Sequence, residues 1–198
     1  MERSSLLDLR PLANFIVDRQ LQFKIGKEPT KADGNCFLNA ILQNLKYLES
    51  LGLWTYRKTP SSVLELRKEV ILFMKQNKRD YIEAGSHDEE SFDRLLSIQQ
   101  RNYEYTDEEG YFVEATAKYL NVELVILIPS LSNSPILPSG CGGPVQRINA
   151  GEDKLRCCLG LLRDEARRTG HYQFIIQTQS VPENPEIENT LHNEATGG

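Results

Sequence analysis

Two distant motifs constrain the fold of this chain most strongly, Asp33-Gly34-Asn35-Cys36 and Gly170-His171-Tyr172. Directly after Cys36, apolar residues recur at three- and four-residue steps, which is the period of a half-buried helix. Residues 171–176 alternate polar and apolar side chains, as a strand with one buried face does. The sequence therefore predicts a cysteine at the start of a helix and a histidine on the first residue of a late strand.

The start of a helix is a suitable position for a cysteine nucleophile. With Asn35 or Asp33 as the cap, free backbone amides and the helix dipole favour an anion there, and they lower the pKa of a thiol below its free value of about 8.5. The same amides, with Gly34 free to bend the backbone, could donate to a developing oxyanion. The ordinary alternative is that Cys36 is a small buried hydrophobic residue.

His171 is the matching candidate for a general base. It comes just after Gly170 at the expected start of a strand, so it can project into a cleft; a structural histidine that caps a loop is the common alternative. Together with Cys36 it matches the nucleophile–base arrangement of cysteine hydrolases, in which the two residues are neighbours in space and not in sequence. The other histidines are weaker candidates, because His87 falls in a polar loop and His192 in a polar tail.

These motifs resemble those of the ovarian-tumour (OTU) family of cysteine proteases, which are deubiquitinases. Residues 33–41 resemble the Asp-Gly-Asn-Cys signature of the family, and Gly170-His171-Tyr172 resembles its closing histidine motif. Between them, residues 114–126 are similar to the central helix-then-strand segment of the family. The order and separation of the three segments agree over roughly residues 21–177.

The resemblance implies a papain-like α/β fold, with a small central sheet flanked by helices, and cleavage of isopeptide bonds in ubiquitin or ubiquitin-like conjugates. Cys36 would attack the scissile carbonyl after giving its proton to His171. Asp33 would join the catalytic site by bending the loop of residues 33–36, whose backbone amides would hold the oxyanion. The implied partners are ubiquitin, polyubiquitin chains or ubiquitin-like modifiers, and no cofactor is implied.

The residue that should orient the histidine departs from the family pattern. Most relatives have Asp or Asn two residues after the histidine, whereas this chain has Gln173. Two steps along a strand return to the same face, so the Gln173 amide oxygen can accept a bond from the imidazole. It is uncharged, however, and stabilises imidazolium less than a carboxylate does. We therefore favour a contribution from an acid before Cys36, for which Asp18 and Asp8 are the candidates.

Gln173 also leaves two alternative functions open. One is a catalytically weak or dead module that binds ubiquitin. The other is a cysteine protease that processes a polyprotein.

Composition is consistent with one compact domain. We expect it over residues 1–178 of the 198, with a core at about 21–177 and a disordered polar tail at 179–198. Lys and Arg number 23 against 28 Asp and Glu, and the net charge of −5 argues against nucleic acid or an anionic membrane as the main partner. Neither a secretory signal nor an apolar run of bilayer length is visible. We expect a monomeric, cytoplasmic protein, delivered into a host cell if it comes from a pathogen or symbiont.

The cysteines predict neither a disulfide framework nor a metal site. Cys36, Cys141, Cys157 and Cys158 lack the spacing of a framework, and an intracellular chain keeps them reduced. Adjacent residues of a strand point to opposite faces, so Cys157 and Cys158 could not easily bind one zinc ion together.

Hydrophobic periodicity outlines the remaining elements. Helices are expected at residues 5–17 with a break at Pro11, at 36–51, at 61–78 with a Ser62–Glu65 capping box, after 88 and at 111–120. Strands are expected at 21–25, 122–128, 157–162 and 171–178, with the last two paired. Residues 129–151 contain four Pro and four Gly and are predicted to form a long loop.

Overall fold

The computed structural model describes residues 7–83, 88–100, 109–131, 143–164 and 169–178. Its elements are, in chain order, α1 (Arg10–Asp18), β1 (Phe23–Ile25), α2 (Cys36–Ser50), α3 (Val63–Gln76), α4 (Lys78–Glu83), α5 (Glu89–Gln100), α6 (Glu109–Leu120), β2 (Glu123–Leu127), a 3-10 turn η1 (Pro129–Leu131), β3 (Val145–Ile148), β4 (Arg156–Asp164) and β5 (Thr169–Gln177). The tail at 179–198, His87, Cys141 and His192 lie outside the described residues, so the expectations for them remain predictions.

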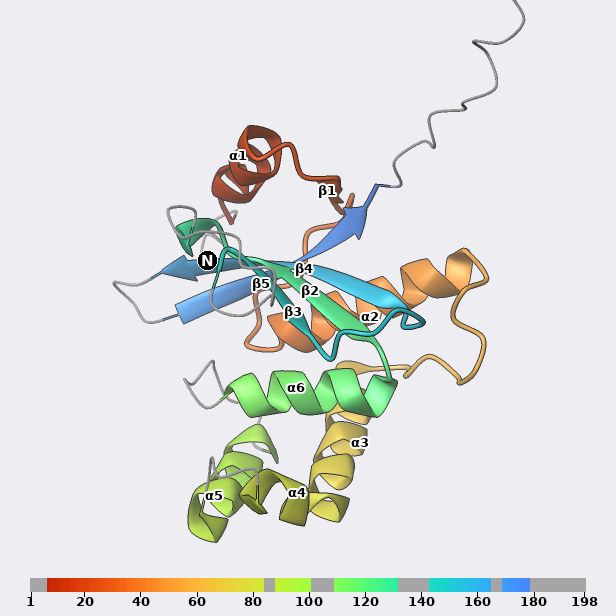
Figure 1. The fold of residues 1–198 in the computed structure, drawn as a ribbon, viewed down its shortest axis with the longest axis vertical. Helices are drawn as coiled ribbons and strands as arrows, with labels where there is room; N and C mark the ends of the chain where they lie inside the picture. The colour runs from red at the N-terminus through yellow and green to blue at the C-terminus, as the bar shows by residue number, and fades with distance from the viewer. Residues whose placement is uncertain (1–6, 84–87, 101–108, 132–142, 165–168, 179–198) are drawn as a thin grey trace, which may run out of the picture.

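A five-stranded sheet in the order β1-β5-β4-β2-β3 forms the middle of the molecule (Figure 1). β2 and β4 are parallel, and the other neighbouring strands are antiparallel. The predicted pairing of the last two strands is confirmed, with Leu162 opposite His171 and Cys158 opposite Ile175. A small sheet flanked by helices is the α/β architecture that the sequence predicts.

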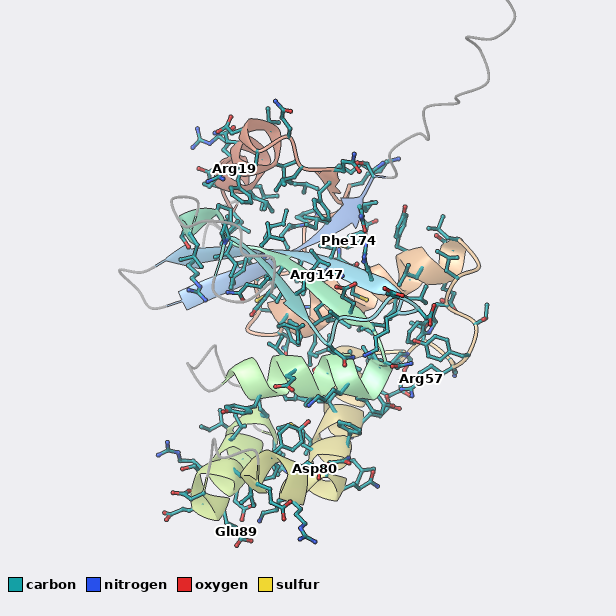
Figure 2. All side chains as sticks on the ribbon, in the orientation of Figure 1. Arg19, Arg57, Asp80, Glu89, Arg147 and Phe174 are labelled. Atoms are coloured by element: carbon teal, nitrogen blue, oxygen red, sulfur yellow. The ribbon has the colours of Figure 1, made fainter. Side chains whose placement is uncertain are left out.

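Helices cover both faces of the sheet, because alternate residues of its inner strands point to opposite sides. α1 packs on one face through Leu12, Phe15 and Ile16. α2 covers the other face, α6 lies beside it, and α3, α4 and α5 form a further helical layer (Figure 1). Glu89, labelled in Figure 2, marks the end of this helical layer away from the sheet. Every residue of β2 is buried, as expected of a strand covered on both faces.

α1 approaches the sheet closely at Gly160 of β4. A Cβ added to Gly160 would overlap the Cδ2 atom of Leu12, so only glycine allows α1 to pack this closely. The predicted break at Pro11 is wrong, because Pro11 lies in the first turn of α1. The N–H that proline lacks has no acceptor within a helix at that position, and the helix continues.

The loop predicted for residues 129–151 is wrong in part. β3 lies within it and pairs with β2 at the edge of the sheet, and η1 forms its first turn. The segment before β3 is rich in turn residues, and β3 is only four residues long, so its alternation is too short to detect. α4 likewise occupies part of residues 79–88, a stretch between two expected helices for which no element was predicted.

The paired strands β4 and β5 extend beyond the apolar segments from which they were predicted. Its pairing continues to Asp164 opposite Thr169, because backbone hydrogen bonds need no apolar side chains. His171 is therefore the third residue of its strand, not the first as predicted.

The capping box predicted for α3 is confirmed in a modified form. The Ser62 hydroxyl accepts a hydrogen bond from Glu65 N at 3.2 Å, while the Glu65 carboxylate accepts from Ser61 N at 2.6 Å. The helix start is thus satisfied from both directions.

Candidate active site

α2 places Cys36 at the first position of a helix that is tied to the sheet. Asn44, buried in the middle of α2, donates to Cys158 O at 3.0 Å and accepts from Cys158 N at 2.8 Å. Near the helix start, the Phe37 ring meets Tyr172 of β5 edge-on, with 5.1 Å between ring centroids. The first contact ties the middle of α2 to β4, and the second holds the N-terminus of α2 against β5.

The free edge of β5 explains where the Cys36 sulfur lies. β1 pairs only with residues 175–177 of β5, so the backbone groups before them need other partners. Gly26 N donates to Phe174 O at 3.1 Å, and Phe174 N donates to Thr30 Oγ1 at 3.0 Å; Phe174 is labelled in Figure 2. The loop between β1 and α2 thus follows the edge of the strand toward Cys36.

Cys36 is the next group along this edge. Tyr172 N donates to Cys36 Sγ at 3.4 Å, and Sγ lies 3.9 Å from Gly170 O. The sulfur is therefore hydrogen-bonded to the two residues that flank His171. The backbone N–H that donates to the sulfur stabilises the negative charge of a thiolate. The structure brings the two residues singled out by the sequence into one site.

His171 is nearly buried, with 7% of its surface exposed. Burial is the main influence on its pKa and lowers it from the ordinary value of 6.5, while a side-chain hydrogen-bonding contact with Gln173 and the negative charge of Asp33 act in the opposite direction. The Nε2 atom is buried and, in the described part of the structure, has no partner of good hydrogen-bond geometry. An imidazole with this lowered pKa is mostly neutral near pH 7, which is the form that accepts a proton.

Gln173 is fully buried, and its amide is held by backbone groups. Its Oε1 accepts from Thr30 N at 3.1 Å, and its Nε2 donates to Phe174 O at 3.2 Å. Thr30 is itself buried, and its hydroxyl lies 2.5 Å from Gln43 Oε1. These bonds fix the orientation of the Gln173 amide. Thr30 and Gln43 were missed at the sequence level, because single polar residues in a loop and on a helix carry no signal of such a contact.

Asp33 bends the loop before Cys36, as the sequence predicts. Its Oδ1 accepts from Asn35 N at 3.0 Å, forming an Asx turn, and from Asn39 Nδ2 at 2.9 Å. Gly34 has a φ of 76°, a left-handed conformation that glycine adopts without strain. The carboxylate of Asp33 therefore determines the shape of this loop.

The predicted cap needs a correction. Asn35 occupies the N-cap position of α2, but its side chain caps no amide of the first turn. Its Oδ1 instead accepts from Arg67 Nη2 at 2.7 Å, and its own N–H is engaged by Asp33. The oxyanion donors would therefore come from the first-turn amides beginning with Cys36, which have no acceptor within the helix.

Neither upstream acid is among the groups that influence His171. Asp8 pairs with Arg10 at 2.7 Å on the surface, and this hydrogen bond lowers the pKa of Asp8 to about 2. Asp18 is the exposed last residue of α1. Of the three candidates, Gln173 is the one whose side chain influences the pKa of His171.

The other two described cysteines are poor nucleophiles. Cys157 and Cys158 lie in the hydrophobic clusters on opposite faces of β4. Burial raises the pKa of Cys157 far above its ordinary value and that of Cys158 to about 12. Among the described residues, no group of three or more His, Cys, Asp or Glu is arranged to hold a metal ion. Within the same ranges, no helix has the length and apolarity needed to cross a bilayer.

Comparison with known proteins gives structural matches alone. A scan of family models and a search of curated proteins found no match. The chain is similar to the OTU domain of OTUD1, with 16% identity over 86% of this chain and 95% of that one and a TM-score of 0.49. It is also similar to an OTU deubiquitinase from Wolbachia pipientis wMel, with 15% identity over 81% and 93% of the two chains and a TM-score of 0.49. Both belong to the family whose motifs this chain resembles.

Proposed function

We propose that this chain is a cysteine hydrolase of the OTU type that cleaves isopeptide bonds of ubiquitin or ubiquitin-like conjugates. The observation that carries the proposal is the position of the Cys36 sulfur at the start of α2, where it is hydrogen-bonded to the two residues that flank His171. The ubiquitin substrate class follows from the resemblance of the motifs. The position of Cys36 beside the residues that flank His171 supports the choice of Cys36 as nucleophile and His171 as base.

In the proposed reaction, Cys36 gives its proton to neutral His171 and attacks the carbonyl carbon of the isopeptide bond. The oxyanion that forms is held by amides at the start of α2. The imidazolium of His171 then protonates the departing lysine amine, which breaks the C–N bond and leaves an acyl-enzyme thioester. Water, activated by neutral His171, hydrolyses the thioester and restores the thiol.

A ubiquitin derivative with an electrophile at its C-terminus tests the proposal directly. We expect the wild-type chain to gain the mass of the probe, the Cys36→Ala variant to gain nothing, and a matched Cys141→Ala variant to react normally. Labelling that persists in a folded Cys36→Ala variant would refute the assignment of the nucleophile.

A ubiquitin-binding module with little or no activity is the second candidate. It is favoured by the buried Nε2 of His171, which lacks a well-formed hydrogen bond among the described residues, and by an amide in place of a carboxylate at Gln173. Saturable binding of ubiquitin by a chain that neither reacts with the probe nor cleaves any chain type would establish this candidate.

Incubation with ubiquitin dimers of every linkage, read on gels as release of monoubiquitin, would define the preferred linkage. Cys36-dependent cleavage of another polypeptide, without release of monoubiquitin, would instead identify a polyprotein protease.

A further inference from the structure

A pocket lies beside the loop that precedes the nucleophile. It is a small hollow, partly open to solvent, whose lining includes Gly34, Asn35, Phe37, Arg67, Gln99 and Phe112. The pocket thus joins the loop, the first turn of α2 and the helical layer. Arg67 from α3 is the charged residue of its wall and is only 5% exposed.

The Arg67 guanidinium connects the helical layer to this loop. Its Nη1 donates to Gln99 O at 3.2 Å and to Gln99 Oε1 at 2.7 Å, near the end of α5. Its Nη2 donates to Asn35 Oδ1 at 2.7 Å, and its Cζ lies 5.5 Å from the centroid of the Phe112 ring on α6. One planar group therefore meets α5, α6 and the residue directly before Cys36.

We propose that Arg67 is a positioning residue that holds the oxyanion loop in its catalytic shape through Asn35. The inference rests on the proposed function. Asn35 and Cys36 share a peptide unit, so a displaced Asn35 also displaces the amide N–H of Cys36. Hydrogen bonds from a charged donor are short and strong, and the guanidinium fork reaches Gln99 and Asn35 in fixed directions, which a lysine ammonium does not reproduce.

The other contacts of residues 33–36 explain why the hydrogen bond from Arg67 to Asn35 matters. Asp33 binds the Asn35 N–H from within the loop, and Gly34 allows the backbone to bend. Arg67 is the contact that fixes Asn35 relative to a separate part of the fold. Misplacing a catalytic group by about 1 Å can cost about a hundredfold in rate. The bond from Arg67 therefore contributes to turnover, although Arg67 touches no substrate.

The kinetic test uses three variants, which are Asn35→Ala, Arg67→Lys and the double variant that combines them. Arg79→Lys is the control. Arg79 is a matched control, because it lies on α4 and pairs with Glu83 at the surface. We expect kcat on a fluorogenic ubiquitin substrate to fall by about 10- to 100-fold in each single variant, with KM unchanged. The double variant should be no worse than the poorer single variant, since both lose the same bond. Arg79→Lys should behave as wild type.

Alkylation of Cys36 by iodoacetamide, followed by mass spectrometry, separates positioning from loss of the thiolate. This reaction needs the thiolate but forms no oxyanion, so its rate should stay near the wild-type value while kcat falls. A parallel loss of alkylation and turnover would overturn the proposal. So would wild-type kcat in a folded Asn35→Ala variant, or losses that multiply in the double variant. Asn35→Ala removes only the loop end of the contact, so it serves if Arg67→Lys does not fold.

Hydrogen–deuterium exchange of the peptide containing residues 33–38 tests, without a substrate, whether Arg67 holds this loop in place. Exchange there should be faster in Asn35→Ala and Arg67→Lys than in the wild type and Arg79→Lys. Unchanged exchange in both variants would refute the positioning role of Arg67 even if the enzyme is active. If the wild type cleaves no ubiquitin substrate, the proposed function fails, and the exchange result alone decides whether Arg67 holds the loop.

Discussion

Replacing Gln173 by alanine should slow turnover by removing the group that orients His171. The substitution also strands the buried N–H of Thr30, which donates to Gln173 Oε1 at 3.1 Å. An unsatisfied buried donor costs about 1–3 kcal/mol of stability, so a loss of activity could reflect unfolding alone. A control with a similar loss of stability but an intact imidazole contact is therefore required.

Thr30→Val supplies this control. It keeps the Thr30 N–H bond to Gln173 but removes the hydroxyl that accepts from Phe174 N at 3.0 Å. A buried backbone donor is again stranded, at a similar cost of about 1–3 kcal/mol. We expect similar urea midpoints for the two variants, but a loss in kcat of about 10- to 100-fold in Gln173→Ala alone, which is below the roughly 10⁴-fold cost of misorienting a triad histidine.

The pH profile of kcat/KM gives a second readout, which a loss of folding stability alone does not change. The contact with Gln173 raises the pKa of His171, so its removal should shift the acidic limb of kcat/KM to lower pH. Equal kinetic losses in Gln173→Ala and Thr30→Val, or an unshifted limb, would refute the orienting role. A silent Gln173→Ala beside a large loss in Asp18→Ala would instead support an acid from the N-terminal segment.

Three further predictions concern His171 and the packing of α1. His171→Ala should lower kcat by about 10²- to 10⁴-fold, whereas His87→Ala should do little; a comparable loss in His87→Ala would mean that the wrong base has been assigned. The folded-state pKa of His171 lies below 6.5, so the unfolded chain takes up this proton first. The wild type should therefore lose stability as the pH falls below 6.5 toward the folded-state pKa. In urea titrations, the free energy of unfolding of His171→Gln should depend less on pH over this window. Gly160→Ala should cost about 1–3 kcal/mol by urea denaturation, because the new methyl group meets Leu12; an unchanged midpoint would contradict this close packing.

Local patterns were sufficient for the parts of the site that depend on neighbouring residues. The period after Cys36 predicted α2 and its first residue, and the alternation around His171 predicted β5. Asp33 was expected to bend its loop, and the Asx turn is a contact between residues two apart. Such features follow from short-range periodicity and turn chemistry, which the order of residues alone specifies.

Tertiary structure decided which distant groups meet. β1 leaves part of the β5 edge open, and Gly26, Thr30 and Cys36 occupy it in turn. Register therefore brings the sulfur next to His171. Contacts such as Thr30 with Gln173, or Arg67 with Asn35, join residues from separate elements. No local pattern encodes them, because a buried polar side chain finds its partner only when packing and strand pairing bring the two elements together.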